Sequence, residues 1–478
     1  MKREKGSITI FSLISLLLIT AALFAMLEGT RFQELQRFAK LQTKAALESV
    51  FANYNTCLWE KYHLLGTNET LMGEQVEKAA DGRTGRGTNF LRLNTEKIAT
   101  KSYTLITDGE GRVFIGSVAG YMRDNLLYET AKELYSQYDA IKHLMDSNQM
   151  DLSDIGTALK EIENTDVPSR TNSFETTATK EAAVDVEAIL EAAKNWQKLG
   201  ILELVIKDTE KLSNAEQDFS DGLLERTLKT GKNYVDTSIG WQERILLQQY
   251  LLTYLSSFQN VQEGRALAYE LEYLIGQKPS DIENLKVVAT RLLTIREAAN
   301  FLYLLSNPEK MAQAEAAATL IAGASLNPVL LEVVKIGILT AWALAESILD
   351  VRALLAGKRI ALLKSEETWT SELFNMSEIT NGFGMAKESS WGLNYENYLG
   401  VLLLLENEQT LAMRTMSVQE ATIRKTYQDV SFQMDLLLTQ ASVQISYSYQ
   451  PVFPFLRMID AEERWKYAVS ATANYGYY

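Results

Sequence analysis

The chain begins with residues 1–32, MKREKGSITIFSLISLLLITAALFAMLEGTRF, and this stretch decides the fold. Lys2, Arg3 and Lys5 precede an uncharged run over residues 7–27, which ends at Glu28. A bilayer core of about 30 Å needs about 20 helical residues, so the run is long enough to span a membrane. A cleaved secretory signal usually has a shorter apolar region, and the best small-residue cleavage motif, at residues 20–22, lies inside the run. The sequence therefore predicts a transmembrane helix over residues 7–27.

The basic residues on the two sides of this run bear on its orientation. Residues 1–6 form a dense basic segment, whereas Arg31, Arg37 and Lys40 are spread along the other side. Basic residues next to a span favour the cytoplasmic side, and long C-terminal domains cross the membrane largely regardless of their charge. We expect a single-pass protein of the cell membrane, with a cytoplasmic N-terminus and the bulk of the chain outside the cytoplasm.

The helix is expected to continue past the membrane surface. Apolar or small residues recur at helical spacing after the span, and no proline interrupts them. The members of this stripe are Leu27, Leu35, Phe38, Ala45, Ala46, Val50 and Tyr54. The pattern predicts one helix whose first half lies in lipid and whose second half packs against a globular domain.

The composition excludes several classes of protein. The formal net charge of −14 opposes nucleic-acid binding, which needs a basic surface against phosphate. The single cysteine, Cys57, excludes an internal disulfide, and the two histidines, His63 and His143, lack the neighbouring ligands of a zinc site. We also find no phosphate-binding loop, dinucleotide fingerprint or nucleophile-elbow motif. We therefore expect neither an enzyme nor a cofactor.

The rest of the chain is predicted to be mainly helical, with a small antiparallel sheet. Residues 28–145 are expected to hold the juxtamembrane helix, a polar loop with short helical pieces over residues 70–100, a β-hairpin over residues 103–115 and a further helix. Residues 146–180 are poor in large apolar side chains and are interpreted as a linker or mobile excursion.

Residues 181–478 are expected to form a large helical domain outside the membrane with one C-terminal strand. Its apolar residues 316–355 are predicted to be buried core helices joined near residue 327, because the uncharged run at residues 336–345 is too short to span a membrane. The strand ends at Pro451 and is expected to pair with the hairpin. The last five residues, NYGYY, are expected to be frayed.

One acidic pair is the best candidate for chemistry. Glu346 and Asp350 are four residues apart, on one face of a predicted helix with apolar surroundings. Two poorly solvated carboxylates can serve acid–base or metal chemistry. They can equally form a structural ion pair, for which the candidate partners are Arg291, Arg296 and Arg352.

Several stretches of the chain together carry a resemblance to a known family. They are GSITIF, EGTRFQELQ and ALESVFANYNTCLWEKYHLLG near the N-terminus, and blocks at residues 104–122, 198–208, 270–316, 326–369 and 392–405. In these stretches the chain resembles an uncharacterised family of single-span envelope proteins of Gram-positive bacteria, a domain of unknown function. The N-terminus of that family is similar to the TadE/TadG-like proteins of Tad (Flp-type) pilus systems. The resemblance implies a non-catalytic accessory component of a Tad-like pilus or cell-envelope assembly, with pilus or envelope proteins as partners.

Two alternatives stay open beside this interpretation. A pilin-like minor subunit would be cut by prepilin peptidase between Gly6 and Ser7. Such subunits usually carry a glutamate five residues after the cut, where this chain has Phe11. A membrane-anchored hydrolase would use Glu346 and Asp350.

Overall fold

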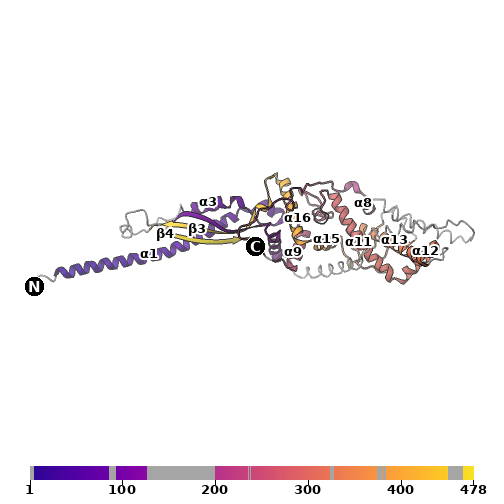
Figure 1. Cartoon of the computed structure of the whole chain (residues 1–478), viewed down its shortest axis with the longest axis horizontal. Coiled ribbons are helices and arrows are strands. Elements are labelled where there is room, and N and C mark those ends of the chain that lie inside the picture. Colours follow the sequence, from indigo (N-terminus) through magenta and orange to yellow (C-terminus); the bar gives the residue numbers. More distant parts are fainter. Residues whose placement is uncertain are drawn as a thin grey trace, which may run out of the picture. The chain divides into compact units, whose positions relative to one another are not determined.

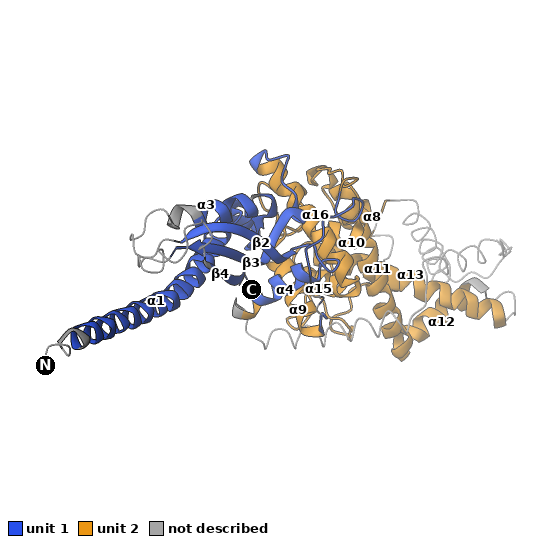
Figure 2. Ribbon diagram, turned by 60° about the vertical axis from the view of Figure 1, so that its left-hand side comes forward, with its two compact units in different colours: residues 1–121, 222–240, 427–478 blue, residues 122–221, 241–426 orange. Residues whose placement is uncertain are grey.

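The computed structural model describes residues 5–84, 93–125, 200–234, 236, 238–322, 328–373, 379, 384–450 and 467–477 (Figure 1). It is mainly helical with a small antiparallel four-stranded sheet, so the predicted fold class is confirmed. The chain divides into two compact units, each built from separate stretches of sequence (Figure 2). Unit 1 comprises residues 1–121, 222–240 and 427–478, and unit 2 comprises residues 122–221 and 241–426. The expected linker over residues 146–180 lies outside the described residues.

Unit 1 begins with one continuous helix, α1 (Lys5–Phe51). Its side chains over residues 8–27 are almost all exposed, and the first buried side chain is Arg31. From there the buried positions recur every three or four residues, as an amphipathic helix requires. They are Leu35, Ala39, Gln42, Thr43, Ala46, Leu47, Val50 and Phe51. The predicted continuation of the helix past residue 27 into a packed domain is therefore confirmed.

The second half of α1 packs against the sheet of unit 1. The central strand, β3 (Leu437–Tyr449), pairs antiparallel with β1 (Thr67–Asn68), β2 (Asn94–Leu105) and β4 (Tyr467–Gly476). Side chains of β3 alternate, and Val443, Ile445 and Tyr447 are buried against α1. The Tyr447 hydroxyl lies 3.0 Å from Thr43 Oγ1 of α1. The predicted C-terminal strand is thus confirmed, together with its pairing to the segment that contains Tyr103.

The predicted hairpin over residues 103–115 is wrong. Residues 103–105 end β2, and residues 112–125 form helix α4 (Arg112–Asn125). Three consecutive residues between them, Gly109, Glu110 and Gly111, adopt positive φ and turn the chain into the helix. Asp108 holds this turn, because its carboxylate accepts from the amides of Leu105 and Gly231.

Two other expectations in unit 1 differ from the structure. The stretch expected to be a polar loop with short helical pieces contains one helix, α3 (Met72–Thr84), but also most of strand β2, which was not expected. Helix α3 buries Val76 and Ala80 in the cluster formed with α1, so a few small apolar residues suffice to dock it. The C-terminal residues are not frayed, because β4 runs to Gly476 and the Tyr477 hydroxyl donates to the carbonyl of Phe51. The other short elements of unit 1 are α2 (Thr56–Tyr62), η1 (Glu69–Leu71) and η5 (Met434–Leu436).

Unit 2 is helical. Its central pair is α11 (Asp281–Ser306) and α13 (Pro328–Leu355), with α12 (Pro308–Ala322) packed on α13. Most side chains of α13 from Val334 onward are buried, so residues 334–355 belong to the core, as predicted for this part of the apolar stretch. The joint expected near residue 327 lies outside the described residues. The remaining helices are α8 (Ile201–Val205), η2 (Thr209–Lys211), α9 (Trp241–Tyr254), α10 (Glu270–Gly276), α15 (Tyr395–Leu405) and α16 (Glu408–Tyr427).

Two described helices, α1 and α13, are long and apolar enough to cross a membrane. Half of the apolar window of α13 is buried inside the protein, as in the core helix of a water-soluble domain. None of the corresponding window of α1 is buried. The length and composition of α1 are those of a membrane anchor or a signal sequence.

Candidate functional site

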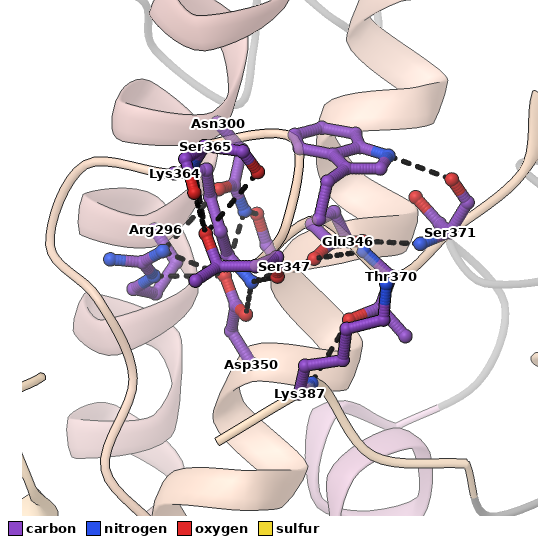
Figure 3. A network of polar contacts seen from close by, with 12 residues as sticks. Arg296, Asn300, Glu346, Ser347, Asp350, Lys364, Ser365, Thr370, Ser371 and Lys387 are labelled. Carbon is purple, nitrogen blue, oxygen red and sulfur yellow. Dashed lines mark hydrogen bonds and ion pairs between the residues drawn. The ribbon is translucent and has the colours of Figure 1, made fainter. Parts of the chain in front are cut away.

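A buried polar network in unit 2 contains both carboxylates of the predicted acidic pair (Figure 3). Helix α13 supplies Glu346 and Asp350, and α11 supplies Arg296 and Asn300. Lys364 comes from the irregular segment that follows α13. The four ionisable side chains are completely buried. Two carboxylates and two basic groups therefore share a site without solvent.

Lys364 joins the two carboxylates. Its Nζ lies 2.7 Å from Glu346 Oε1 and 2.7 Å from Asp350 Oδ1. It also donates to the carbonyl of Thr368, at 3.1 Å. Two hydrogen bonds, to Glu346 and Thr368, and the ion pair with Asp350 therefore hold the ammonium group in place.

Arg296 covers the other side of Asp350. Its Nε donates to Asp350 Oδ2 at 2.9 Å, and the same oxygen accepts from Asn300 Nδ2 at 2.9 Å. The remaining guanidinium donors reach the carbonyl of Leu362 and the hydroxyl of Tyr398. Burial alone lowers the pKa of Arg296, but the Asp350 carboxylate and Tyr398 outweigh it and raise this pKa above its ordinary value. Arg296 is therefore held as a cation.

Glu346 is also fixed by backbone groups. Its Oε2 accepts from the amide of Ser371 at 2.7 Å, and the amide of Thr370 donates to the same carboxylate. Ser371 in turn accepts from the indole nitrogen of Trp342, at 3.1 Å. The carboxylate of Glu346 thus orders the segment over residues 364–371 against α13.

The chemistry of this network is that of a charge-balanced structural core. Three of the four carboxylate oxygens accept hydrogen bonds, and the fourth, Asp350 Oδ1, is held by its ion pair with Lys364. Neither side chain contacts solvent, so a substrate has no route to an oxygen atom of either. Among the described residues, no group of three or more His, Cys, Asp or Glu side chains is arranged to hold a metal ion. Removing one partner from such a buried network leaves an uncompensated charge, which costs several kcal/mol.

Sequence reasoning found part of this network. The i,i+4 spacing correctly predicts that Glu346 and Asp350 share one helix face. Of the three arginines predicted as candidate partners, Arg296 is the one that pairs with Asp350. The other two lie elsewhere: Arg291 pairs with Glu406 at 2.8 Å, and Arg352 Nε donates to the carbonyl of Leu204. Lys364 was missed, because no local pattern marks a lysine in an irregular segment as buried.

A second group of buried carboxylates lies at the ends of α10 and α11. The carboxylate of Asp281 accepts from the amides of Ala268 and Tyr269, and Glu270 accepts from the amide and hydroxyl of Ser256. Glu272 Oε1 accepts from the amide of Phe258 at 2.9 Å and from the hydroxyl of Tyr395 at 2.7 Å. Burial raises the pKa of Glu272 to about 7, and the hydrogen bonds from Phe258 and Tyr395 lower it only in part.

The remaining residues considered from sequence have structural settings. Cys57 is a free thiol in α2 and is half-buried. His63 ends α2 in the left-handed conformation and stacks on Tyr121, with ring centroids 5.6 Å apart. Gly6 and Ser7 lie in the first turn of α1. The structure brings none of these residues into the network around Asp350.

The chain is a mainly helical protein with a long apolar N-terminal helix and a small antiparallel sheet. Residues 179–449 match a family of unknown function (DUF5702). The match covers more than half of the chain, so the protein belongs to this family. No curated protein and no solved structure matches the chain.

Proposed function

We propose that this protein is a membrane-anchored, non-catalytic accessory component of a Tad-like pilus or a related cell-envelope assembly. One observation carries the proposal: α1 is a single helix with an exposed apolar half and a half that packs into unit 1. About 20 exposed apolar residues cannot stay in water, and a bilayer is the solvent that suits them. The similarity of the N-terminal residues to TadE/TadG-like proteins supplies the Tad-like and Gram-positive setting.

The proposed topology follows from the charges around this helix. Residues 1–6 would lie in the cytoplasm, and both compact units would lie outside it. The protein would hold a partner at the membrane, since the anchor fixes its position and unit 2 offers a large helical body. The family match over residues 179–449 gives no activity that would argue against a binding role.

A second candidate is a pilin-like minor subunit, cut between Gly6 and Ser7. The packing of α1 on an antiparallel sheet favours it, because the exposed halves of several copies could bundle together in a filament. Phe11 opposes it: after the cut, the new N-terminal amine would lack the carboxylate that compensates it, and an unpaired charge in an apolar environment is costly.

The third candidate, a hydrolase using Glu346 and Asp350, has less support. Both carboxylates are buried and paired with Lys364 and Arg296. Substituting Glu346→Gln or Asp350→Asn should lower thermal stability before it changes any function in envelope assembly. An activity lost at unchanged stability would favour the hydrolase.

The intact mass of the mature protein from isolated membranes tests the proposal. A mass that begins at Met1 supports a permanent anchor and the accessory role. A mass that begins at Ser7 supports the minor subunit, which should then also be present in purified filaments. A chain cut after Ala22, or one recovered entirely in the soluble fraction, would contradict both.

A further inference from the structure

Helix α1 begins to pack against the rest of unit 1 one helical turn beyond its exposed apolar half. Leu27 is exposed, and Arg31 is the first buried side chain, only 2% exposed. Residues 8–27 of a helix span about 30 Å, the thickness of the hydrocarbon core. Arg31 then stands about 6 Å further along the axis, within the layer of the lipid headgroups.

Arg31 ties this point of α1 to one end of the sheet. Its guanidinium lies 2.6 Å from Glu28 Oε1 and donates to the carbonyl of Gln450 at 3.2 Å. It also lies over the ring of Tyr449, 5.6 Å from the centroid, and the ring of Phe32 packs on the same tyrosine. Tyr449 pairs with Tyr467, so the contact marks the end of the sheet at which β3 stops and β4 starts.

The strands run away from this end alongside α1. Twenty residues after Arg31, Phe51 of α1 packs against Tyr475 and Tyr477, with ring centroids 4.9 and 5.0 Å away. The Tyr449 end of β3 and the Tyr475 end of β4 are therefore both fixed on α1, and β4 runs beside this helix (Figure 1). The end of the sheet at Tyr449 faces the exposed half of α1, and the end at Tyr475 lies farthest from it.

We propose that the end of the sheet at Tyr449 and Tyr467 rests on the phospholipid headgroup layer, and that the ion pair of Glu28 with Arg31 sets this depth. The inference rests on the proposed anchor function. Phe32, which packs on Tyr449 and is partly exposed, is an aromatic side chain of the kind that suits the membrane interface. The end of the described sheet would thus lie about one helical turn beyond the membrane-spanning half of α1.

Single fluorescent labels on two positions of one strand test this contact. Ala468 and Asn474 are both exposed and lie on the same face of β4. The two residues are six positions apart along the strand, so their Cα atoms lie about 20 Å from each other. Each is changed to cysteine in the full chain carrying Cys57→Ser, labelled with bimane and reconstituted in phosphatidylcholine vesicles that contain a headgroup-attached nitroxide lipid. The Ala468→Cys label should be quenched several-fold more strongly than the matched Asn474→Cys label.

A third label distinguishes a failure of the headgroup contact from a failure of the membrane anchor. Leu27→Cys should be quenched by nitroxides on the acyl chains near the headgroup. If Leu27 is quenched but Ala468 and Asn474 are equally unquenched, the anchor stands and the headgroup contact is overturned. If Leu27 is not quenched, the anchor is overturned.

The role of the ion pair is tested in the same vesicles. Arg31→Gln should reduce the quenching at Ala468 while leaving that at Leu27 unchanged, and Arg31→Lys should restore part of it. Unchanged quenching at Ala468 in a folded Arg31→Gln protein, as judged by circular dichroism, would overturn the role of Arg31 in setting the depth.

Discussion

Lys364 Nζ lies 2.7 Å from Asp350 Oδ1, and neither side chain has any exposed surface. Asp350 belongs to α13, and Lys364 to the irregular segment that follows it. This contact closes that segment back onto the helix. Because the pair is dry, its strength depends on both charges being present.

Replacing Lys364 should therefore lower the free energy of unfolding. In Lys364→Met, Glu346 and Asp350 lose their shared cation, and we expect the free energy of unfolding to fall by about 3–5 kcal/mol. Urea titration followed by circular dichroism measures the change. Lys286→Met on the exposed side of α11 is the matched control and should stay within about 0.5 kcal/mol of the unaltered protein.

A double variant tests whether the loss of stability in Lys364→Met comes from the carboxylates left without a cation. Adding Glu346→Gln to Lys364→Met removes one stranded charge, so the double variant should be more stable than the sum of the two single losses predicts. Strict additivity of the two losses would show that Lys364 and Glu346 are not coupled.

Glu272 should make the stability of unit 2 depend on pH. Burial raises its pKa from 4.5 to about 7, so between these values the folded chain binds a proton that the unfolded chain does not. The free energy of unfolding then falls as pH rises through this window. Glu272→Gln keeps an acceptor for Phe258 and Tyr395 and should stabilise the protein by about 1–3 kcal/mol at pH 8, with little effect at pH 5.

Thermal unfolding at the two pH values measures this difference. Glu283→Gln, at an exposed position of the first turn of α11, should shift stability equally at both. A Glu272→Gln effect of the same size at pH 5 and pH 8 would mean that Glu272 stays ionised in the folded protein.

Two leucines of α1 test its packing on the sheet. Leu47 is completely buried in the cluster of unit 1, whereas Leu41 is 66% exposed. Leu47→Ala should cost about 2–5 kcal/mol through the cavity it leaves, and Leu41→Ala should cost little. Limited proteolysis of residues 31–51 in detergent compares them. Equal protection in the two variants would contradict the packing of this half of α1.

Gly392 is a position where a side chain has no room. A Cβ atom there would stand 2.6 Å from the carbonyl oxygen of Ile360 and 2.7 Å from its nitrogen, both of them backbone atoms. Gly392→Ala should therefore break the bridge between Ile360 and Leu393 and lower the melting temperature. Gly384→Ala is the control, because among the described residues its Cβ would meet Leu349 alone, at an ordinary 3.6 Å.

The elements that could be predicted from sequence are those whose pattern is local. The apolar run and stripe of α1, the alternation of β3 and the apolar stretch of α12 and α13 each carry a clear periodicity. Strand β4 does not: YAVSATANYG is rich in alanine and small polar residues, and its strand conformation comes from pairing with β3. The Asp-Gly signal at residue 108 was misleading, because three successive positive φ angles lead into a helix.

In the buried network, too, the local pattern could be predicted from sequence and the long-range contact could not. Helical spacing alone predicted that Glu346 and Asp350 share a face. The lysine that joins them lies 14 residues beyond Asp350, and its burial depends on the tertiary path of an irregular segment. Local sequence carries no signal for such a contact.

The position of β4 at residues 467–476 also sets the order in which the protein can be completed during synthesis. α1 emerges first, but the strand that covers much of its buried face emerges last. At about 5–20 residues per second, some 400 residues take about 20–80 s to follow. The helices of unit 2 are all made within that interval, so they can fold while Leu35 and Leu47 of α1 still lack their final neighbours. A ribosome that stops before residue 467 would release a chain with a finished unit 2 and an open unit 1.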